Sequence, residues 1–511
     1  MKNLKYILIL LVMMGSASCG DDYLELTDPN QIDKETFWNT EEDFEKGVNG
    51  IYQSMYYDGS YMRLAPLALD LRGDDVRGDS PWPVIDLAGR FGRATDELLQ
   101  HWTWIAFYGG VHRANNVISR IENPEIEFSS QEARNALHGQ ALFLRGLYYM
   151  HLVTWYNNIP LVLEPYETPD DFYPEQSDPA AVWNQIIQDF QQAAELLPQS
   201  YTDASDLGRA TKGAATAYLG KAYLFNEQYQ AAANEFQKVM GMGYSLMPNY
   251  ADNFTEEHEN NAESIYEIQF DREVGGAELG WVRMPAANWS KTSARAITYA
   301  PVGFGWSDVL PTRWAFEQFM VEPTAEGNVD PRLDATMFYN YPGATVYGVP
   351  YEQQYGEGTT DIYPKKYQNY RTLPDEFDWR SGINERLMRY ADVLLMYAET
   401  QIALGNTAEA AKYIQMVRSR ANLPDREAEL AAMSPDALFM ELAHQRLLEF
   451  TFEGKRFDDI RRWGWLEDPA MLAELKARDS EFNGYTPGRE FYFIPQAELD
   501  RHPTMVQNPG Y

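Results

Sequence analysis

Tryptophan residues in two loop-like stretches have the clearest potential for binding chemistry. Trp82 lies between two prolines, and Trp306 lies in the sequence GFGWSD at 303–308, so both rings have loop sequences around them that favour exposure. A flat indole covers the apolar C–H face of a sugar ring, while nearby polar groups receive the sugar hydroxyls. We therefore predict a ligand site formed by Trp306, Trp82, Trp281, Trp289, Asp75, Arg77 and Asp79. The alternative role for each ring is packing in the core or within a loop.

The spacing patterns of common catalytic sites are absent from the sequence. The histidines form no His-Glu-x-x-His pair, there is no Gly-x-Ser-x-Gly turn, and the sequence GRATKGA at 208–214 lacks the ending of a phosphate loop, so it is interpreted as a helix start. Two carboxylates such as Asp74 and Asp79 could support glycoside hydrolysis, but with 76 acidic residues such a pair has no specificity. We predict no catalytic residue, no metal site and no cofactor.

The first residues predict an exported and lipid-anchored protein. Lys2 and Lys5 precede an apolar run at 6–14, and Cys19, the single cysteine of the 511 residues, follows a stretch of small residues. The run is shorter than the roughly 20 residues that a spanning helix needs. A short apolar run of this kind is typical of a cleaved signal peptide. We therefore predict a signal peptide at 1–18 and a lipid on the thiol of Cys19, which anchors the chain to a membrane.

The overall charge makes nucleic acid an improbable partner. The formal net charge is −34, and no cluster of Lys and Arg appears along the chain. Such a field repels phosphate polyanions but does not exclude neutral ligands. Aromatic residues make up 14% of the chain, more than a core demands, which is consistent with aromatic rings that bind carbohydrate.

Apolar residues at intervals of three and four predict a largely helical chain. The expected helical segments are 41–56, 102–121, 131–155, 178–197, 208–240, 384–420 and 434–465. Two of them resemble tetratricopeptide repeats: LGKAY at 219–223 and YAE at 397–399 are each followed by a turn and a second helix with alanine and aromatic positions. An ordinary helical hairpin is the alternative for either segment alone. Together they predict a mostly α fold, a tetratricopeptide-like helical-repeat scaffold with long irregular aromatic-rich loops.

The segment 273–381 differs from this scaffold. It is rich in Trp, Tyr, Gly and Pro and has little helical period after 311–320. A long irregular insertion on a rigid scaffold is usually a binding surface. The stretch 70–86, which contains Trp82, is of the same type.

Several motifs of the C-terminal third resemble the SusD/RagB family. They are RYADVLLMYAE at 389–399, VRSRA at 417–421, EFTFEGKRFDDIRRWG at 449–464, and the closing IP at 494–495 and QNPGY at 507–511. The resemblance extends to Cys19, to the start of the mature chain at 36–43 and to the helix at 102–116, so it spans essentially the whole mature chain. Within 446–461, arginines and carboxylates fall at spacings that allow ion pairs along a helix and across its turn.

The resemblance implies a non-enzymatic surface lipoprotein that binds a glycan and delivers it to a partner TonB-dependent (SusC-like) outer-membrane transporter. It implies an outer-membrane location, lipid-anchored and facing the cell exterior, an N-terminal region at 19–230, and a C-terminal region at 231–511 with the ligand-binding insertion 273–381. It also implies that the ligand loops lie outside the repeats, in stretches that here hold the four tryptophans named above. Two alternatives remain open: an anchored glycoside hydrolase, and a repeat protein that binds peptides or proteins without a sugar site.

Overall fold

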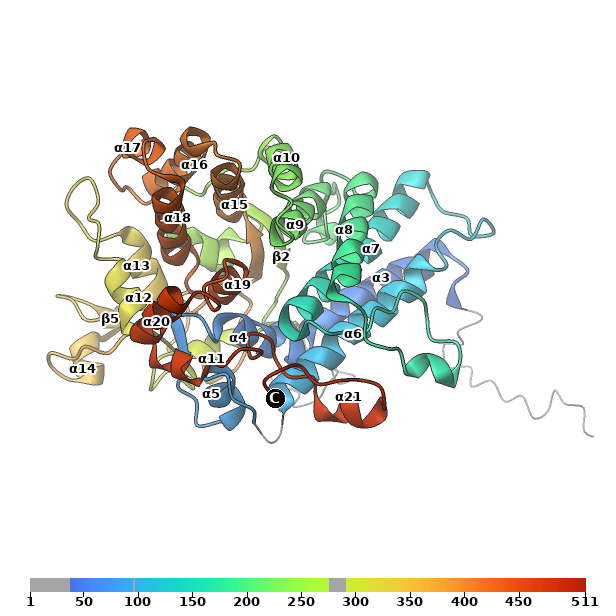
Figure 1. Ribbon diagram of the computed structural model, residues 1–511, viewed down its shortest axis with the longest axis horizontal. Helices are drawn as coiled ribbons and strands as arrows, with labels where there is room; N and C mark the ends of the chain where they lie inside the picture. The colour runs from blue at the N-terminus through green and yellow to red at the C-terminus, as the bar shows by residue number, and fades with distance from the viewer. Residues whose placement is uncertain (1–36, 95–96, 275–290) are drawn as a thin grey trace, which may run out of the picture.

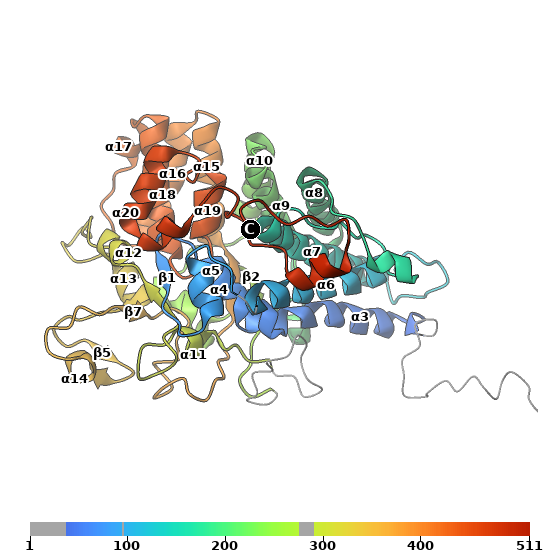
Figure 2. The same ribbon diagram turned by 60° about the horizontal axis from the view of Figure 1, so that its bottom comes forward.

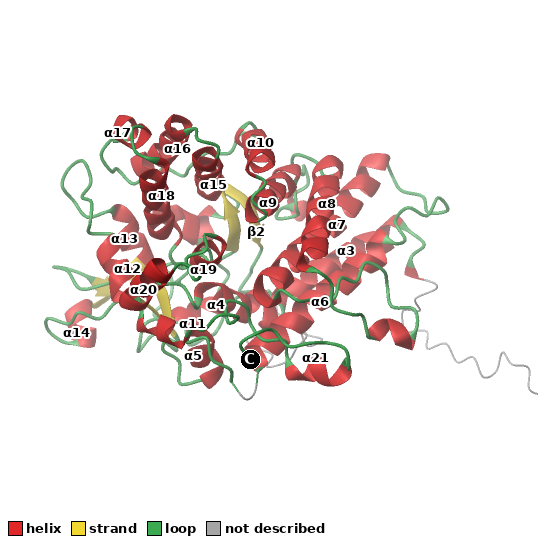
Figure 3. Ribbon diagram, viewed as in Figure 1, coloured by secondary structure: helices red, strands yellow, loops and turns green. Residues whose placement is uncertain are grey.

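The computed structural model describes residues 37–94, 97–274 and 291–511. Most of these residues are in helices, and the strands are short (Figure 3). The mostly α fold class expected from the sequence is therefore confirmed. Among the described residues, none of the helices is both long enough and apolar enough to cross a bilayer.

Long helices form one half of the molecule (Figure 1). They are α3 (Glu41–Gln53), α6 (Leu98–Ile118), α7 (Gln131–Tyr156) and α8 (Pro179–Leu196). Glycines let them approach closely: a Cβ atom on Gly110 would lie 2.3 Å from the Tyr148 ring, and one on Gly146 would lie 2.9 Å from the Phe190 ring. The helices expected at 41–56, 102–121, 131–155 and 178–197 are confirmed with small shifts at their ends.

Two helical hairpins follow these long helices in the fold. They consist of α9 (Lys212–Phe225) with α10 (Tyr229–Met240), and α15 (Tyr390–Ala403) with α16 (Thr407–Arg420). Thr211 caps the start of α9, as the interpretation of 208–214 requires, and Gly220 leaves room for the Phe236 ring, which a Cβ would meet at 2.6 Å. The hairpins touch through α10 and α15, where Gln237 Nε2 donates to Tyr397 OH at 2.7 Å. Small residues at the crossing and an aromatic beside them are the repeat-like packing that the sequence predicts.

The expected helix at 384–420 does not begin as a helix. Its first residues form β8 (Glu385–Arg389), which pairs antiparallel with β2 (Ser264–Ile268). All five residues of β8 are buried, and its charged side chains find partners inside, such as Arg386 with Glu267 at 3.3 Å. Because buried ion pairs place charged residues on inward faces, the strand shows none of the alternation that identifies a half-exposed strand from sequence.

Between β2 and β8, the described residues 269–274 and 291–384 contain only short elements. They are α11 (Arg295–Tyr299), β3 (Val309–Pro311), α12 (Arg313–Gln318), α13 (Pro331–Thr336), β4 (Met337–Phe338), β5 (Thr345–Val346), β6 (Val349–Pro350), α14 (Tyr351–Tyr355) and β7 (Tyr363–Pro364). β4 pairs with β7 and β5 with β6 within this region, whereas β3 pairs with β1 (Val76–Gly78) from the N-terminal part. The largely irregular character expected for 273–381 is seen in its described residues.

The remaining α-helices are α4 (Leu64–Asp70), α5 (Pro83–Gly89), α17 (Glu427–Ala431), α18 (Pro435–Phe450), α19 (Arg456–Arg462), α20 (Pro469–Arg478) and α21 (Gln496–Arg501). Of these, α17 and α18 pack on the α15–α16 hairpin (Figure 2). The ion pairs expected for 446–461 form, but many of them reach other elements rather than run along one helix.

Glu449 and Arg446 show how these pairs connect the fold. The fully buried Glu449 carboxylate lies 3.1 Å from Arg389, 3.4 Å from Arg332 and also against Arg420. Arg446 contacts Asp459 at 2.6 Å across the turn between α18 and α19. The three arginines lower the pKa of Glu449 against the opposing effect of burial, so the carboxylate stays charged. The resulting network joins elements that are far apart in the sequence.

Candidate functional site: a tryptophan cluster

The pairing of β1 with β3 brings the two tryptophan loops of the sequence prediction together. The strands are antiparallel, with Val76 opposite Pro311. Beyond the strands, the Asp79 N–H donates to the Asp308 carbonyl at 2.9 Å, and Ser80 Oγ donates to Asp308 Oδ1 at 2.7 Å. Ser80 Oγ also accepts from the Trp82 N–H at 3.0 Å. The backbone of Trp82 is thus fixed relative to the loop that carries Trp306.

Three half-buried tryptophans form the candidate site, and we call them the tryptophan cluster: Trp82, Trp306 and Trp379. The guanidinium carbon of Arg63 lies 5.3 Å from the centre of the Trp82 ring and 6.0 Å from that of Trp306. Trp379 meets Trp306 edge to face, with ring centres 5.4 Å apart and an angle of 72°. Both geometries are favourable for cation–π and aromatic contacts. The cluster therefore contains two of the four tryptophans that the sequence predicts.

Arg63, which lies against these rings, is held in place by a buried ion pair. Its side chain is 2% exposed, and its Nε and Nη2 atoms each donate to a carboxylate oxygen of Asp58 at 2.7 Å. Burial raises the pKa of Asp58, and the attraction of Arg63 offsets part of that rise. The segment that carries both residues is irregular, since Ser60 departs from helical angles and no side chain caps α4. Such a segment has no period that sequence analysis could detect.

The Trp306 loop is held against α11 by backbone hydrogen bonds. The Trp306 N–H donates to the Ile297 carbonyl and the Asp308 N–H to the Thr298 carbonyl, at 2.8 and 2.9 Å. Gly305 is needed for this approach, because a Cβ atom there would lie 2.6 Å from the Ile297 oxygen. Gly303 has a φ of 92°, a region that favours glycine. Gly303 and Gly305 therefore both have the structural role that the sequence predicts for glycines in this loop.

Charged side chains lie next to the rings. Asp378 precedes Trp379 and contacts Arg380 at 2.8 Å and Arg272 at 2.9 Å. The hydrogen bond from Arg380 lowers the pKa of Asp378, so this partly exposed carboxylate is ionised at neutral pH and accepts hydrogen bonds. Arg77 and Asp79 are exposed on the strand and turn that lead to Trp82.

Asp75 lies in the interior, unlike its predicted neighbours. Its side chain is 2% exposed, and burial beside Asp74 raises its pKa well above the usual range. Asp75 is therefore not accessible to a ligand at the surface. The physical reason is that its neighbour Asp74 binds Arg456 and Arg478 beneath the surface, at 2.5 and 3.0 Å, and takes this turn of the chain inward.

Some of the predicted residues lie outside the described part of the chain: Trp281, Trp289 and Cys19. Two members of the site were not predicted as ligand residues. Trp379 lies in the same irregular segment as Trp306, which was a usable signal, whereas nothing in the sequence around Arg63 distinguishes it. Across residues 37–94, 97–274 and 291–511, no group of three or more His, Cys, Asp or Glu side chains is arranged to hold a metal ion.

Comparison with known proteins places this chain and its fold in a family. The model of the SusD family matches residues 262–511, and a model described as "Starch-binding associating with outer membrane" matches residues 22–224. SusD-like protein P2 of Formosa agariphila is 27% identical over 534 aligned residues, which cover 100% of this chain and 99% of that protein. A SusD superfamily protein of Bacteroides vulgatus superposes with a TM-score of 0.82 at 30% identity, covering 93% of this chain and 100% of that one.

A second solved structure is a laminarin-binding SusD-like protein, with a TM-score of 0.73 and 26% identity over 93% of this chain and 100% of that one. The mostly helical fold is thus shared with SusD-like proteins. The chain belongs to the SusD/RagB family.

Proposed function

We propose that this protein is a non-enzymatic glycan-binding lipoprotein of the outer membrane, and that the tryptophan cluster is its glycan site. The observation that carries the proposal is the convergence of Trp82 and Trp306 on one buried arginine, although they come from loops that are distant in the sequence. All three rings of the cluster remain partly exposed, so part of each ring is open to a ligand.

A sugar chain would be bound by two kinds of contact. The indole faces cover the C–H faces of sugar rings, and the exposed Asp79 and Arg77, with the partly exposed Asp378, exchange hydrogen bonds with hydroxyls at the edge. Arg63 is too deeply buried to contact the sugar directly. Its role is to hold the rings in the orientation that the sugar requires, which reduces the ordering needed on binding.

The similar proteins support this assignment of ligand class. One solved relative is described as laminarin-binding, and one matching family model is described as starch-binding. Both ligands are neutral glucans, and a chain with a net charge of −34 favours neutral over anionic ligands.

The location and partner complete the proposal. The lipid on Cys19 would hold the protein on the outer membrane, facing the exterior, and a TonB-dependent (SusC-like) transporter would accept the captured glycan. The description of the N-terminal family model, which includes association with the outer membrane, supports the location. The transporter is a proposal from family membership.

A glycan panel tests the function. The mature protein is run on gels containing laminarin, starch, xylan, mannan or pectin, and the glycan that retards it most is titrated by calorimetry. We expect binding in the millimolar to micromolar range, about 4 to 8 kcal/mol, without release of new reducing ends. Turnover would support the anchored hydrolase, and no retardation in any gel would favour a protein-binding repeat protein.

Co-purification tests the partner. A tagged protein is isolated in mild detergent from its own cells, grown on the preferred glycan. A TonB-dependent transporter should be recovered in near-equal amounts, and its absence would contradict the delivery step while leaving glycan binding intact.

A further inference from the structure

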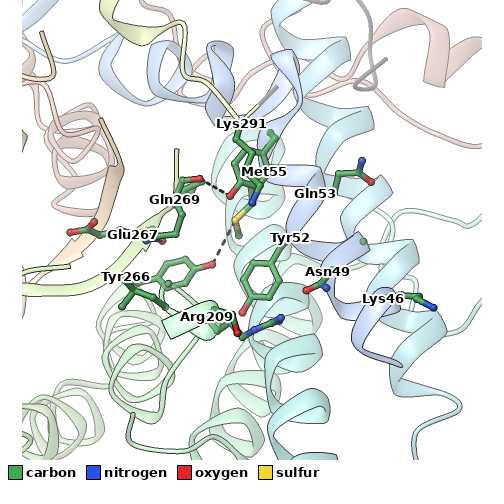
Figure 4. Close-up of a pocket in the computed structure, with 16 residues that line it drawn as sticks. Lys46, Asn49, Tyr52, Gln53, Met55, Arg209, Tyr266, Glu267, Gln269 and Lys291 are labelled. Atoms are coloured by element: carbon green, nitrogen blue, oxygen red, sulfur yellow. Dashed lines mark hydrogen bonds between the residues drawn. The ribbon is translucent and has the colours of Figure 1, made fainter. Parts of the chain in front are cut away.

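A cavity of about 560 Å³ lies between α3 and β2, apart from the tryptophan cluster (Figure 4). Asn49 and Gln53, on α3, and Gln269, directly after β2, are among the residues that line it. Arg209, just before α9, also lines it. The volume falls within the range of about 300–1,000 Å³ that is typical of ligand pockets.

Two tyrosines form fixed walls of this cavity. Tyr52 OH donates to Gln140 Oε1 at 3.2 Å and accepts from the Ala210 N–H at 2.9 Å. Tyr56 OH donates to the Gln269 carbonyl at 2.7 Å. Because both hydroxyls are engaged, the half-buried rings are held in place and present their apolar surfaces to the cavity.

The amide side chains of Asn49 and Gln53 are available to a ligand. They lie four residues apart on the outer face of α3, and within the described part of the chain neither side chain forms a hydrogen bond. A primary amide offers two donors and one acceptor oxygen. That combination matches a sugar hydroxyl, which both donates and accepts.

Three of the charged residues that line the cavity, Lys46, Arg209 and Glu267, have polar or charged partners. Lys46 contacts Glu42 at 2.8 Å, and Arg209 contacts Asp206 at 2.7 Å. Glu267 is 2% exposed, and its oxygens accept from the Asn260 N–H at 3.1 Å. With these charges paired, the cavity is suited to a neutral ligand rather than to an anion.

The cavity and the tryptophan cluster are neighbours. The Ala294 N–H donates to the Met62 carbonyl at 2.8 Å, directly before Arg63. Lys291, which lines the cavity, is three residues before Ala294, a stretch that spans at most about 11 Å. In Figure 2, α11 and α3 both lie along the lower side of the molecule.

We propose that the cavity between α3 and β2 is a second subsite for a neutral glycan, so that a long sugar chain contacts both the cavity and the tryptophan cluster. This inference rests on the proposed function, because it assumes that the same glycan binds at the cluster. Short oligosaccharides would be held by the rings alone, and longer ones would gain the amide contacts.

The test measures affinity against glycan length in the mature protein. Short and long oligosaccharides of the panel polysaccharide that binds most strongly are titrated into wild type and into the double variant Asn49→Ala/Gln53→Ala. We expect the variant to bind short oligosaccharides like wild type and long ones about tenfold more weakly, the loss of one or two neutral hydrogen bonds. Alanine is a good helix former, so α3 is retained. Glu45→Ala, on the same helix but not lining the cavity, is the matched control.

The outcomes separate the two proposals. Equal affinity of variant and wild type at every length, with a measurable wild-type affinity, overturns the second subsite alone. A wild type that binds no panel glycan overturns both the subsite and the proposed function. Tighter binding of a pectin fragment than of any neutral oligosaccharide, lost in the double variant, would overturn the assignment to neutral glycans.

Discussion

Ser80 and Asp308 are 228 positions apart in the sequence, and a hydrogen bond of 2.7 Å joins their side chains. Since the same serine oxygen accepts the Trp82 N–H, this contact sets the position of one tryptophan loop relative to the other. Burial raises the pKa of Asp308, and the Ser80 hydroxyl partly offsets that rise. The two loops therefore act as a single structural unit.

Removal of one indole should weaken glycan binding without unfolding the protein. Trp306→Ala and Trp82→Ala should each reduce affinity some five- to thirtyfold, about 1 to 2 kcal/mol, because one stacking face is lost. Calorimetric titration of the preferred glycan measures the effect. Trp183→Ala, a half-buried tryptophan on α8, is the control and should bind like wild type. Wild-type affinity in both site variants would place the glycan elsewhere.

Removal of Arg63 should destabilise the fold. Arg63→Met leaves the buried Asp58 carboxylate without its partner, and such a loss typically costs about 3 to 5 kcal/mol. Urea denaturation gives the change in the free energy of unfolding. Adding Asp58→Asn removes the uncompensated charge, so the double variant should recover much of the loss. If the double variant is no more stable than the single one, the ion pair is not the cause.

Glu481 should make stability fall with rising pH. Burial, aided by Asp479, raises its pKa from 4.5 to about 8, so the folded state holds a proton that the unfolded state releases above pH 4.5. Stability that depends on this group is therefore present at low pH and declines as pH rises from about 4.5 to about 8. The Glu481→Gln variant has no carboxyl group to release a proton, so its stability should not decline in this way. Above pH 8 its free energy of unfolding should exceed that of wild type by up to about 4 kcal/mol.

Urea denaturation of this variant at several pH values measures the difference. The exposed Glu357→Gln is the matched control and should follow wild type. A constant difference between Glu481→Gln and wild type across the range would contradict the raised pKa.

Cys19 should determine membrane attachment. Because Cys19 is the single cysteine of the chain, Cys19→Ala removes the predicted lipid, and the protein should leave the membrane fraction. The measurement is fractionation of cells that lack the partner transporter, so that a protein contact cannot replace the lipid. Unchanged attachment would refute the anchor. Cleavage of the wild type by external protease on intact cells would test the exterior orientation.

The helices could be predicted from sequence because their apolar residues recur at the helical period. α7 begins at the expected Gln131, and the two repeat hairpins were recognised from small and aromatic positions. The strand β8 was missed because its charged residues are paired inside the protein. Local patterns therefore describe local structure and fail where distant partners decide the burial of a residue.

The candidate site shows the same limit. The loop setting of Trp82 and Trp306 could be read from prolines and glycines, but their proximity depends on β1 and β3, which have three residues each. Strands so short carry no usable periodicity. Asp75 looked equivalent to Asp79 in the sequence, yet the first is buried and the second exposed.

The pairing of β1 with β3 also determines how a bound sugar would affect the whole molecule. A ligand that touches Trp82 and Trp306 is a non-covalent cross-link between segments from opposite halves of the chain. Its binding energy stabilises both loops together, because neither loop alone forms the complete site. Ligand occupancy is therefore thermodynamically linked to the global unfolding transition, and at a hundredfold excess over Kd it adds about 2.7 kcal/mol to the stability of the entire fold.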